Sequence, residues 1–89
     1  MSIAFDELLN AARQLGMTIR SAHLGGSGGG VAQFKSQAQL FIDLDADAAE
    51  QLAQTAKALC DDPRLESLFL RPDVRELLDA YRAPPKKSP

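Results

Sequence analysis

A run of glycines constrains the fold of this chain more than any other sequence feature. The stretch Leu24–Gly30 has the sequence LGGSGGG and holds five of the six glycines among 89 residues. Glycine adopts positive φ angles at little steric cost, but it loses more backbone freedom on ordering than any other residue. Three interpretations follow: a flexible hairpin or linker, a backbone that packs closely against another element or a partner, or a cradle for an anion.

Known phosphate-binding motifs do not match this loop. A dinucleotide-binding loop requires Gly-x-Gly-x-x-Gly, and here the third glycine position is occupied by Val31 or Gln33. The nucleotide-triphosphate loop requires Lys and Ser or Thr directly after its last glycine, whereas Val31 and Ala32 follow Gly30. A ligand at this loop would therefore need the loop backbone and nearby side chains. The candidate ligand-binding residues are Arg20, His23, Gly25, Gly26, Ser27, Gly28, Gly29, Gly30 and Arg71.

Three segments have the apolar spacing of amphipathic helices. The first covers about residues 3–15 and ends at Gly16, a residue typical of the position after a helix. The second covers about residues 47–60, because Asp47 and Glu50 have the spacing of a capping box. The third begins at Pro72, which is favoured in the first helical turn, and buries a face that includes Tyr81.

Four short segments have the composition of strands: about residues 17–24, 31–35, 39–44 and 65–70. Ser36 and Gln37 are predicted to form the tight turn between the second and the third. We therefore expect an α+β domain over residues 1–82 in the order α-β-β-β-α-β-α. Its three- or four-stranded sheet is expected to be mainly antiparallel, with about three helices on one face. Residues 83–89 are predicted to form a disordered tail.

The face of the sheet opposite the helices is predicted to carry Phe34 and Phe41. Both are large aromatic residues on predicted strands of one hairpin. Exposed apolar patches of this kind commonly mark surfaces of association. A domain of this size is also marginally stable alone, because it buries only about 60–65% of the surface of its unfolded chain. These two residues are the candidate interaction residues, with a second copy or another protein as partner.

A catalytic nucleophile with its partners is not evident. Residues 25–29 match the Gly-x-Ser-x-Gly pattern around Ser27, but a hydrolase elbow needs a histidine later in the chain and none follows. His23 is the only histidine, and it lies at the mouth of the loop, where a general base could meet a substrate. Cys60, the only cysteine, falls on the apolar face of a predicted helix. We therefore predict no catalytic residues.

A metal or cofactor site has equally little support. His23 and Cys60 would need carboxylates to complete a zinc site, which is a poor ligand set. Asp43, Asp45 and Asp47 are spaced by two residues and could hold a divalent cation, but position 48 lacks the glycine of a calcium loop. Helix capping explains Asp47, and solvation at a strand end explains the other two. No metal site and no cofactor are predicted.

Charge and hydropathy exclude several classes of partner. The formal net charge is −2, whereas general nucleic-acid binders have a basic face. The first residues lack the basic start of a secretory signal, and no apolar run approaches the roughly 20 residues of a membrane span. A single cysteine fits a reducing compartment. We therefore expect a cytoplasmic protein that contacts neither nucleic acid nor membrane.

Three segments together resemble a group of small bacterial proteins that have no assigned activity. They are the glycine-rich loop, residues 40–46 with the sequence LFIDLDA, and residues 70–78 with the sequence LRPDVRELL. The resemblance covers about residues 4–82 and implies the order of elements and a cytoplasmic bacterial setting. The order helix, strand, hairpin and helix is also similar to the first part of ImmA/IrrE-type metallopeptidases. Those proteins carry His-Glu-x-x-His on the helix after the hairpin, where residues 49–57 here contain no histidine. That resemblance therefore implies a shared scaffold without the peptidase activity.

Three functional hypotheses of different classes follow from the sequence. The leading one is a non-catalytic interaction or regulatory module that self-associates through the sheet face or the glycine-rich loop. The alternative is a binder of a small molecule or an anion that uses the loop backbone. A hydrolase that uses Ser27 or Cys60 is a third and weaker hypothesis, because both residues lack catalytic partners in the sequence.

Overall fold

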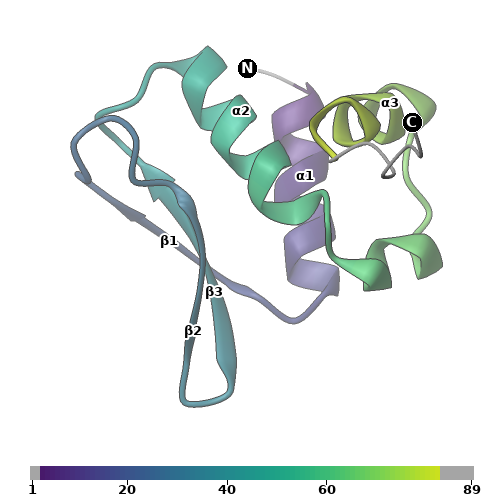
Figure 1. Cartoon of the computed structure of the whole chain (residues 1–89), viewed down its shortest axis with the longest axis horizontal. Coiled ribbons are helices and arrows are strands. Elements are labelled where there is room, and N and C mark those ends of the chain that lie inside the picture. The colour runs from purple at the N-terminus through teal and green to yellow at the C-terminus, as the bar shows by residue number, and fades with distance from the viewer. Residues whose placement is uncertain (1–2, 83–89) are drawn as a thin grey trace, which may run out of the picture.

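The computed structural model describes residues 3–82 and confirms the α+β class, with three helices and a three-stranded mixed sheet (Figure 1). The predicted tail, residues 83–89, lies outside the described residues. The elements are α1 (Ile3–Gln14), β1 (Thr18–Ala22), β2 (Gly30–Phe34), β3 (Gln37–Asp43), α2 (Ala48–Leu59), the 3₁₀ helix η1 (Pro63–Ser67) and α3 (Pro72–Tyr81).

The three predicted helices are all present, and their ends have the predicted signals. Gly16 follows α1 with φ of +84°. Asp47 caps α2 by accepting a hydrogen bond from the Glu50 amide at 2.8 Å. Pro72 occupies the first turn of α3. Local sequence signals therefore mark the end of α1 and the starts of α2 and α3.

The sheet has β3 at its centre, with β1 on one side and β2 on the other. β1 runs parallel to β3, with Ile19 opposite Leu40, and β2 runs antiparallel to it, with Val31 opposite the same leucine. The prediction of a mainly antiparallel sheet is therefore wrong, because one of the two strand pairings is parallel. The parallel pairing arises because the chain passes over the end of β3 between β1 and β2 instead of turning back directly.

The hairpin between β2 and β3 turns one residue earlier than predicted. Lys35 and Ser36 form the turn, with φ of 52° and 68°, and Phe34 pairs with Gln37. Two positive φ angles are the signature of the type I′ turn, which matches the twist of a two-residue hairpin. Asn-Gly normally occupies such a turn, so the sequence here gave no clear signal for it.

The predicted fourth strand is wrong, because residues 63–67 form η1. Asp62 accepts a hydrogen bond from the Arg64 amide at 2.9 Å, and Pro63 follows in the first turn. Arg64 also donates to the Leu15 carbonyl at 3.1 Å, which ties this turn to the end of α1. Capping and this tertiary contact favour a turn where the apolar composition alone suggests a strand.

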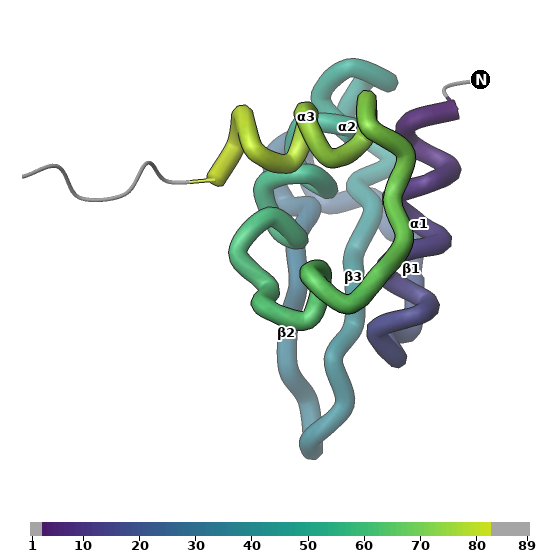
Figure 2. The backbone as a smooth tube through the Cα atoms, turned by 90° about the vertical axis from the view of Figure 1, so that its right-hand side faces the viewer, coloured from purple at the N-terminus to yellow at the C-terminus, as the bar shows by residue number. Residues whose placement is uncertain are grey.

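All three helices lie on one side of the sheet (Figure 1). α1 packs against β1, α2 packs against β2 and β3, and α3 packs on α1 and α2. The tip of the β2–β3 hairpin reaches beyond the helices (Figure 2). The core between the layers contains buried apolar side chains from every helix and from β3, including Leu8, Ala12, Leu40, Ile42, Ala56, Leu59, Leu65, Val74 and Leu78.

No helix within residues 3–82 is both long enough and apolar enough to span a membrane. The longest helices, α1 and α2, have 12 residues each. A membrane span needs roughly 20 residues.

Candidate functional site

The glycine-rich segment forms an arch over the carboxyl end of the central strand. We call residues 23–29 the glycine arch. It leaves β1 after Ala22, which lies opposite Asp43 at the end of β3, and enters β2 at Gly30, which lies opposite Phe41. Because β3 lies between β1 and β2, the arch spans two strand spacings, or roughly 10 Å. The end of β3 therefore lies beneath the arch.

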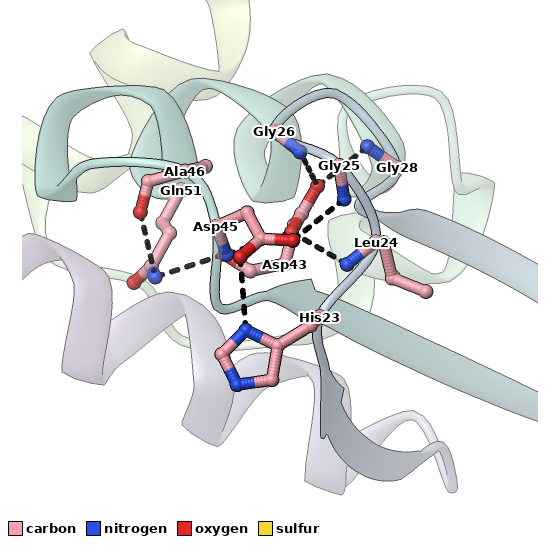
Figure 3. Close-up of polar contacts among 9 residues, drawn as sticks. All are labelled: His23, Leu24, Gly25, Gly26, Gly28, Asp43, Asp45, Ala46 and Gln51. Carbon is pink, nitrogen blue, oxygen red and sulfur yellow. Dashed lines mark hydrogen bonds and ion pairs between the residues drawn. The ribbon is translucent and has the colours of Figure 1, made fainter.

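Asp43 is the residue around which the arch is built (Figure 3). Its side chain is fully buried, and its carboxylate accepts four backbone hydrogen bonds. Oδ2 accepts from the amides of Gly26 at 2.7 Å and Gly28 at 2.8 Å. Oδ1 accepts from the amides of Leu24 at 3.0 Å and Asp45 at 2.9 Å. The carboxylate thus fills the space that an exogenous anion would occupy in a phosphate-binding loop.

Two opposing effects act on the pKa of Asp43. Burial raises the pKa of a carboxyl group, because it removes water from the charged form. The amides of Gly28, Asp45, Leu24 and Gly26 outweigh this effect and hold the pKa of Asp43 below its ordinary value. Asp43 is therefore charged at neutral pH, and the arch is held by charge-assisted hydrogen bonds.

A second carboxylate holds the outer side of the arch. Asp45 Oδ1 lies 2.9 Å from His23 Nδ1, and Asp45 Oδ2 accepts from the Gly25 amide at 2.9 Å (Figure 3). The hydrogen bonds from His23 and from Gly25 lower the pKa of Asp45. His23 itself is exposed, with 72% of its side-chain surface accessible. It is thus placed as a surface partner of Asp45.

Gln54 on α2 ties the far end of the arch to the helical layer. Its Oε1 accepts from the Gly29 amide at 2.8 Å, and its Nε2 donates to the Gly26 carbonyl at 2.9 Å. The same Nε2 donates to Glu50 Oε2 at 3.0 Å. One amide side chain therefore satisfies both a donor and an acceptor of the arch, using both halves of its hydrogen-bonding capacity.

The glycines are needed where the arch curves and where it packs closely. Gly26 has φ of +103°, a conformation that other residues rarely adopt. A Cβ atom on Gly28 would lie 2.5 Å from Leu24 Cβ and 2.9 Å from the Leu24 carbonyl oxygen. A Cβ atom on Gly29 would collide with Gln54 Oε1 of α2 and lie 3.2 Å from the Phe41 carbonyl oxygen of β3. Of the three interpretations of the loop, close packing of its backbone against another element is the one that the contacts of Gly29 match.

The same contacts leave few amides of the arch for a ligand. Five of them, those of Leu24, Gly25, Gly26, Gly28 and Gly29, already donate to side chains of the protein. The amides of the arch therefore converge on an anion, as in the predicted cradle. That anion is the carboxylate of Asp43 from the same chain. A ligand near the arch has to use neighbouring side chains instead.

A cleft of about 600 Å³ lies between the arch, the start of β2 and the helices α2 and α3. The arch and the start of β2 contribute backbone and small side chains to its lining, and α2 contributes charged, polar and small side chains. Tyr81 of α3 also lines it and is 40% exposed, so the prediction that Tyr81 lies on the buried face of its helix is wrong. The lining residues are Ser27, Gly29, Gly30, Val31, Glu50, Ala53, Gln54, Lys57, Ala58 and Tyr81. Among the predicted ligand-binding residues, the cleft therefore includes Ser27, Gly29 and Gly30.

The two arginines of the predicted ligand set lie away from this cleft. Arg20 is opposite Phe41 in the sheet and lines a hollow on the uncovered sheet face. Arg71 precedes α3 and pairs with Asp73, with Nε 3.2 Å from Oδ1. Neither arginine lines the cleft beside the arch. Their positive charge was the reason to expect both arginines near the loop, but the fold places them elsewhere.

The uncovered face of the sheet carries the two predicted interaction residues. Phe34 is 62% exposed, whereas Phe41 is half-buried. They line a shallow hollow of about 550 Å³ together with Arg20, Ala32, Gln33 and Gln39. Phe34 and Phe41 thus lie on one continuous surface that the helices leave open.

The structure adds no catalytic constellation to the sequence analysis. Within residues 3–82, no group of three or more His, Cys, Asp and Glu side chains is placed to hold a metal ion. Cys60 is buried, and burial, followed by the charge of Asp61, raises the pKa of its thiol. Among these residues His23 has a carboxylate partner, Asp45, but it makes no hydrogen bond to a serine or a cysteine.

Sequence reasoning missed the residues that organise the arch. Strand-end solvation is the role that the sequence predicts for Asp43, and it predicts no site role for Gln54, Lys57 or Tyr81. One sequence feature does indicate a structural role for Asp43. It directly follows the apolar run Leu40–Ile42 and therefore falls at the boundary of the core. Nothing in the sequence indicated that the glycine amides would surround it.

Comparison with protein-family models, curated proteins and solved structures finds no match for this chain. The resemblances described above therefore stay predictions, and function has to be argued from the geometry.

Proposed function

We propose that this chain is a non-catalytic cytoplasmic interaction module that self-associates through the uncovered face of its sheet. The observation that carries the proposal is the exposure of Phe34, at 62%, on a sheet face that also displays Phe41. A large aromatic side chain left in water forgoes roughly 1.5–3 kcal/mol that burial would provide. Covering it with a partner recovers that free energy.

The composition of this face suits a protein partner. Its hollow combines two aromatic rings with Arg20, and aromatic residues and arginine are enriched at the centres of interfaces. The remaining lining residues are alanine and glutamine, which carry no charge that burial would penalise. Lys35 lies beside this face, with its Nζ 5.4 Å from the centre of the Phe34 ring.

Sedimentation of the purified protein over a wide concentration range tests this proposal. The parent protein is expected to form a dimer or a larger assembly, and Phe34→Glu and Phe41→Glu are expected to shift it towards monomer. Gln14→Glu adds the same charge at an exposed position of α1 and is expected to leave the assembly unchanged. Circular dichroism confirms that each variant is folded. A parent that is monomeric at every concentration would contradict self-association.

The cleft beside the arch supports a second candidate function, the binding of a small polar molecule. Its volume of about 600 Å³ lies within the range of ligand sites, and Lys57 and Glu50 offer opposite charges along one helix. Thermal shift against a panel of metabolites and nucleotides tests this candidate. A ligand at 100 times its Kd stabilises the protein by about 2.7 kcal/mol. Lys57→Ala and Glu50→Ala should abolish the shift for an anionic and a cationic ligand respectively.

A further inference from the structure

We infer that the partner is a second copy of this chain, and that the two copies pair antiparallel through the free edge of β2 with Ala32 at the twofold axis. The result is a continuous six-stranded sheet. This inference rests on the proposed self-association. It places the contact at the β2 edge that borders the uncovered face, and it adds the direction and the register of the pairing.

The two free edges of the sheet differ in how well they can accept another strand. The β1 edge carries Arg20, and charged residues on an edge strand discourage pairing. The β2 edge, Gly30–Phe34, contains neither a charge nor a proline, and four of its five residues are exposed. The hairpin that contains it extends beyond the helical layer, so no described element covers the edge near its tip (Figure 2). β2 is therefore the edge that is open to another strand.

The hairpin fixes which backbone groups of β2 point outward. In a two-residue hairpin the residues flanking the turn, here Phe34 and Gln37, exchange both backbone hydrogen bonds. The ladder alternates from there, so Ala32 and Gly30 also bond to β3, while the N–H and C=O groups of Val31 and Gln33 point away from it. An added strand meets these four groups. Symmetric antiparallel pairing then joins Val31 of each copy to Gln33 of the other.

This register makes the exposed aromatic residue complementary to a glycine. With Ala32 opposite Ala32 of the second copy, Phe34 of one copy lies opposite Gly30 of the other. Residues directly opposite in a sheet point to the same face, and Gly30 lies opposite Phe41 within its own copy. The ring of Phe34 can therefore extend across a position without a side chain towards Phe41 of the second copy. The pairing thus brings Phe34, which is 62% exposed, against the second copy at two symmetric places.

Charge favours the same arrangement. Lys35 follows one end of β2, and Glu50 lies in the cleft beside Gly29 and Gly30 at the other end. Antiparallel pairing brings Lys35 of each copy to the end where Glu50 of the second copy lies. A parallel arrangement would instead place lysine beside lysine and glutamate beside glutamate, which is unfavourable.

Disulfide trapping tests the register directly. In this arrangement Ala32 and its symmetry mate form a pair without direct hydrogen bonds, with Cα atoms about 4.5 Å apart, which suits a disulfide. Ala32→Cys is expected to give a covalent dimer on mild oxidation. Gln39→Cys presents a thiol on the same face, but it is separated from its mate by three strand spacings, roughly 14 Å, and should give none. The parent, whose Cys60 is buried, provides the background.

A proline at the free edge provides an independent readout. Gln33→Pro removes an outward N–H group and leaves the β2–β3 ladder intact, so the variant is expected to stay folded and to raise the dimer dissociation constant at least tenfold. Gln33→Ala keeps the N–H group and is expected to behave as the parent. A parent that does not dimerise overturns the proposed function and this inference together. A parent dimer that is neither trapped by Ala32→Cys nor weakened by Gln33→Pro overturns the edge pairing alone and leaves self-association through the open face.

Discussion

The carboxylate of Asp43 lies 2.7 Å from the amide nitrogen of Gly26, a residue 17 positions earlier in the chain. This contact joins the end of the central strand to the arch that crosses over it. It belongs to a set of four backbone amides around one buried charge. We therefore expect the order of the arch to depend on Asp43 more than on any other side chain.

Asp43→Asn tests this dependence. The substitution removes the charge and places an NH₂ group where two amide donors point, so at least two hydrogen bonds are lost. We expect the melting temperature to fall by roughly 10 °C or more, because a domain of this size loses about 4–8 °C for each 1 kcal/mol. Asp61→Asn, at an exposed position beyond α2, serves as control and should change it little. An Asp43→Asn variant as stable as the parent would show that the arch does not need this carboxylate.

Hydrogen exchange gives a residue-level version of the same test. The amides of Gly26 and Gly28 donate to Asp43 and should exchange slowly, whereas the exposed Ser27 between them has no described acceptor and should exchange quickly. Asp43→Asn should accelerate the two glycine amides towards the rate of Ser27. Equal and fast exchange of all three amides in the parent would mean that the arch is not ordered in solution.

Stability is expected to fall as the pH drops below about 4. Backbone amides outweigh burial and lower the pKa of Asp43, and His23 and the Gly25 amide lower that of Asp45. A group whose pKa is lower in the folded state stabilises the protein fully above its unfolded pKa, about 3.9 for aspartate. That stabilisation is lost as the pH falls through the folded pKa. Urea unfolding at several pH values between 7 and 3 measures the loss, and Asp43→Asn should show a smaller one.

Adding a methyl group to Gly28 should destabilise the protein. Its Cβ would lie 2.9 Å from the Leu24 carbonyl oxygen and 2.5 Å from Leu24 Cβ, so the backbone of the arch would have to move. We expect Gly28→Ala to cost roughly 1–3 kcal/mol in unfolding free energy, as overpacked sites do. Ser27→Ala at the exposed neighbouring position should stay within about 0.5 kcal/mol of the parent. A neutral Gly28→Ala would contradict the close approach of Gly28 to Leu24 within the arch.

The parts of this fold that were predicted correctly depend on local signals. Caps and apolar spacing fixed the three helices, because Asp47 and Pro72 act on the residues next to them. The hairpin turn was misplaced by one residue because Lys35 and Ser36 adopt positive φ angles that their own preferences do not favour. The candidate site could not be predicted in this way, because the arch amides that donate to Asp43 come near it only where the chain crosses over β3. Such a contact depends on the order in which the strands are connected in the sheet, and local sequence patterns do not show that order.

The final prediction concerns Gln54, which connects the arch to α2. Gln54→Glu keeps an acceptor for the Gly29 amide, but it loses the NH₂ group that donates to the Gly26 carbonyl and to Glu50. It also places two carboxylates four residues apart on one helix, which is unfavourable. We expect a loss of roughly 1–3 kcal/mol in unfolding free energy, because the part-buried Gly26 carbonyl loses its donor. Gln14→Glu on the exposed side of α1 is the matched control and should stay within about 0.5 kcal/mol of the parent. If the two variants are equally stable, α2 does not hold the arch through this side chain, and the wall of the cleft that Gln54 forms is free to move.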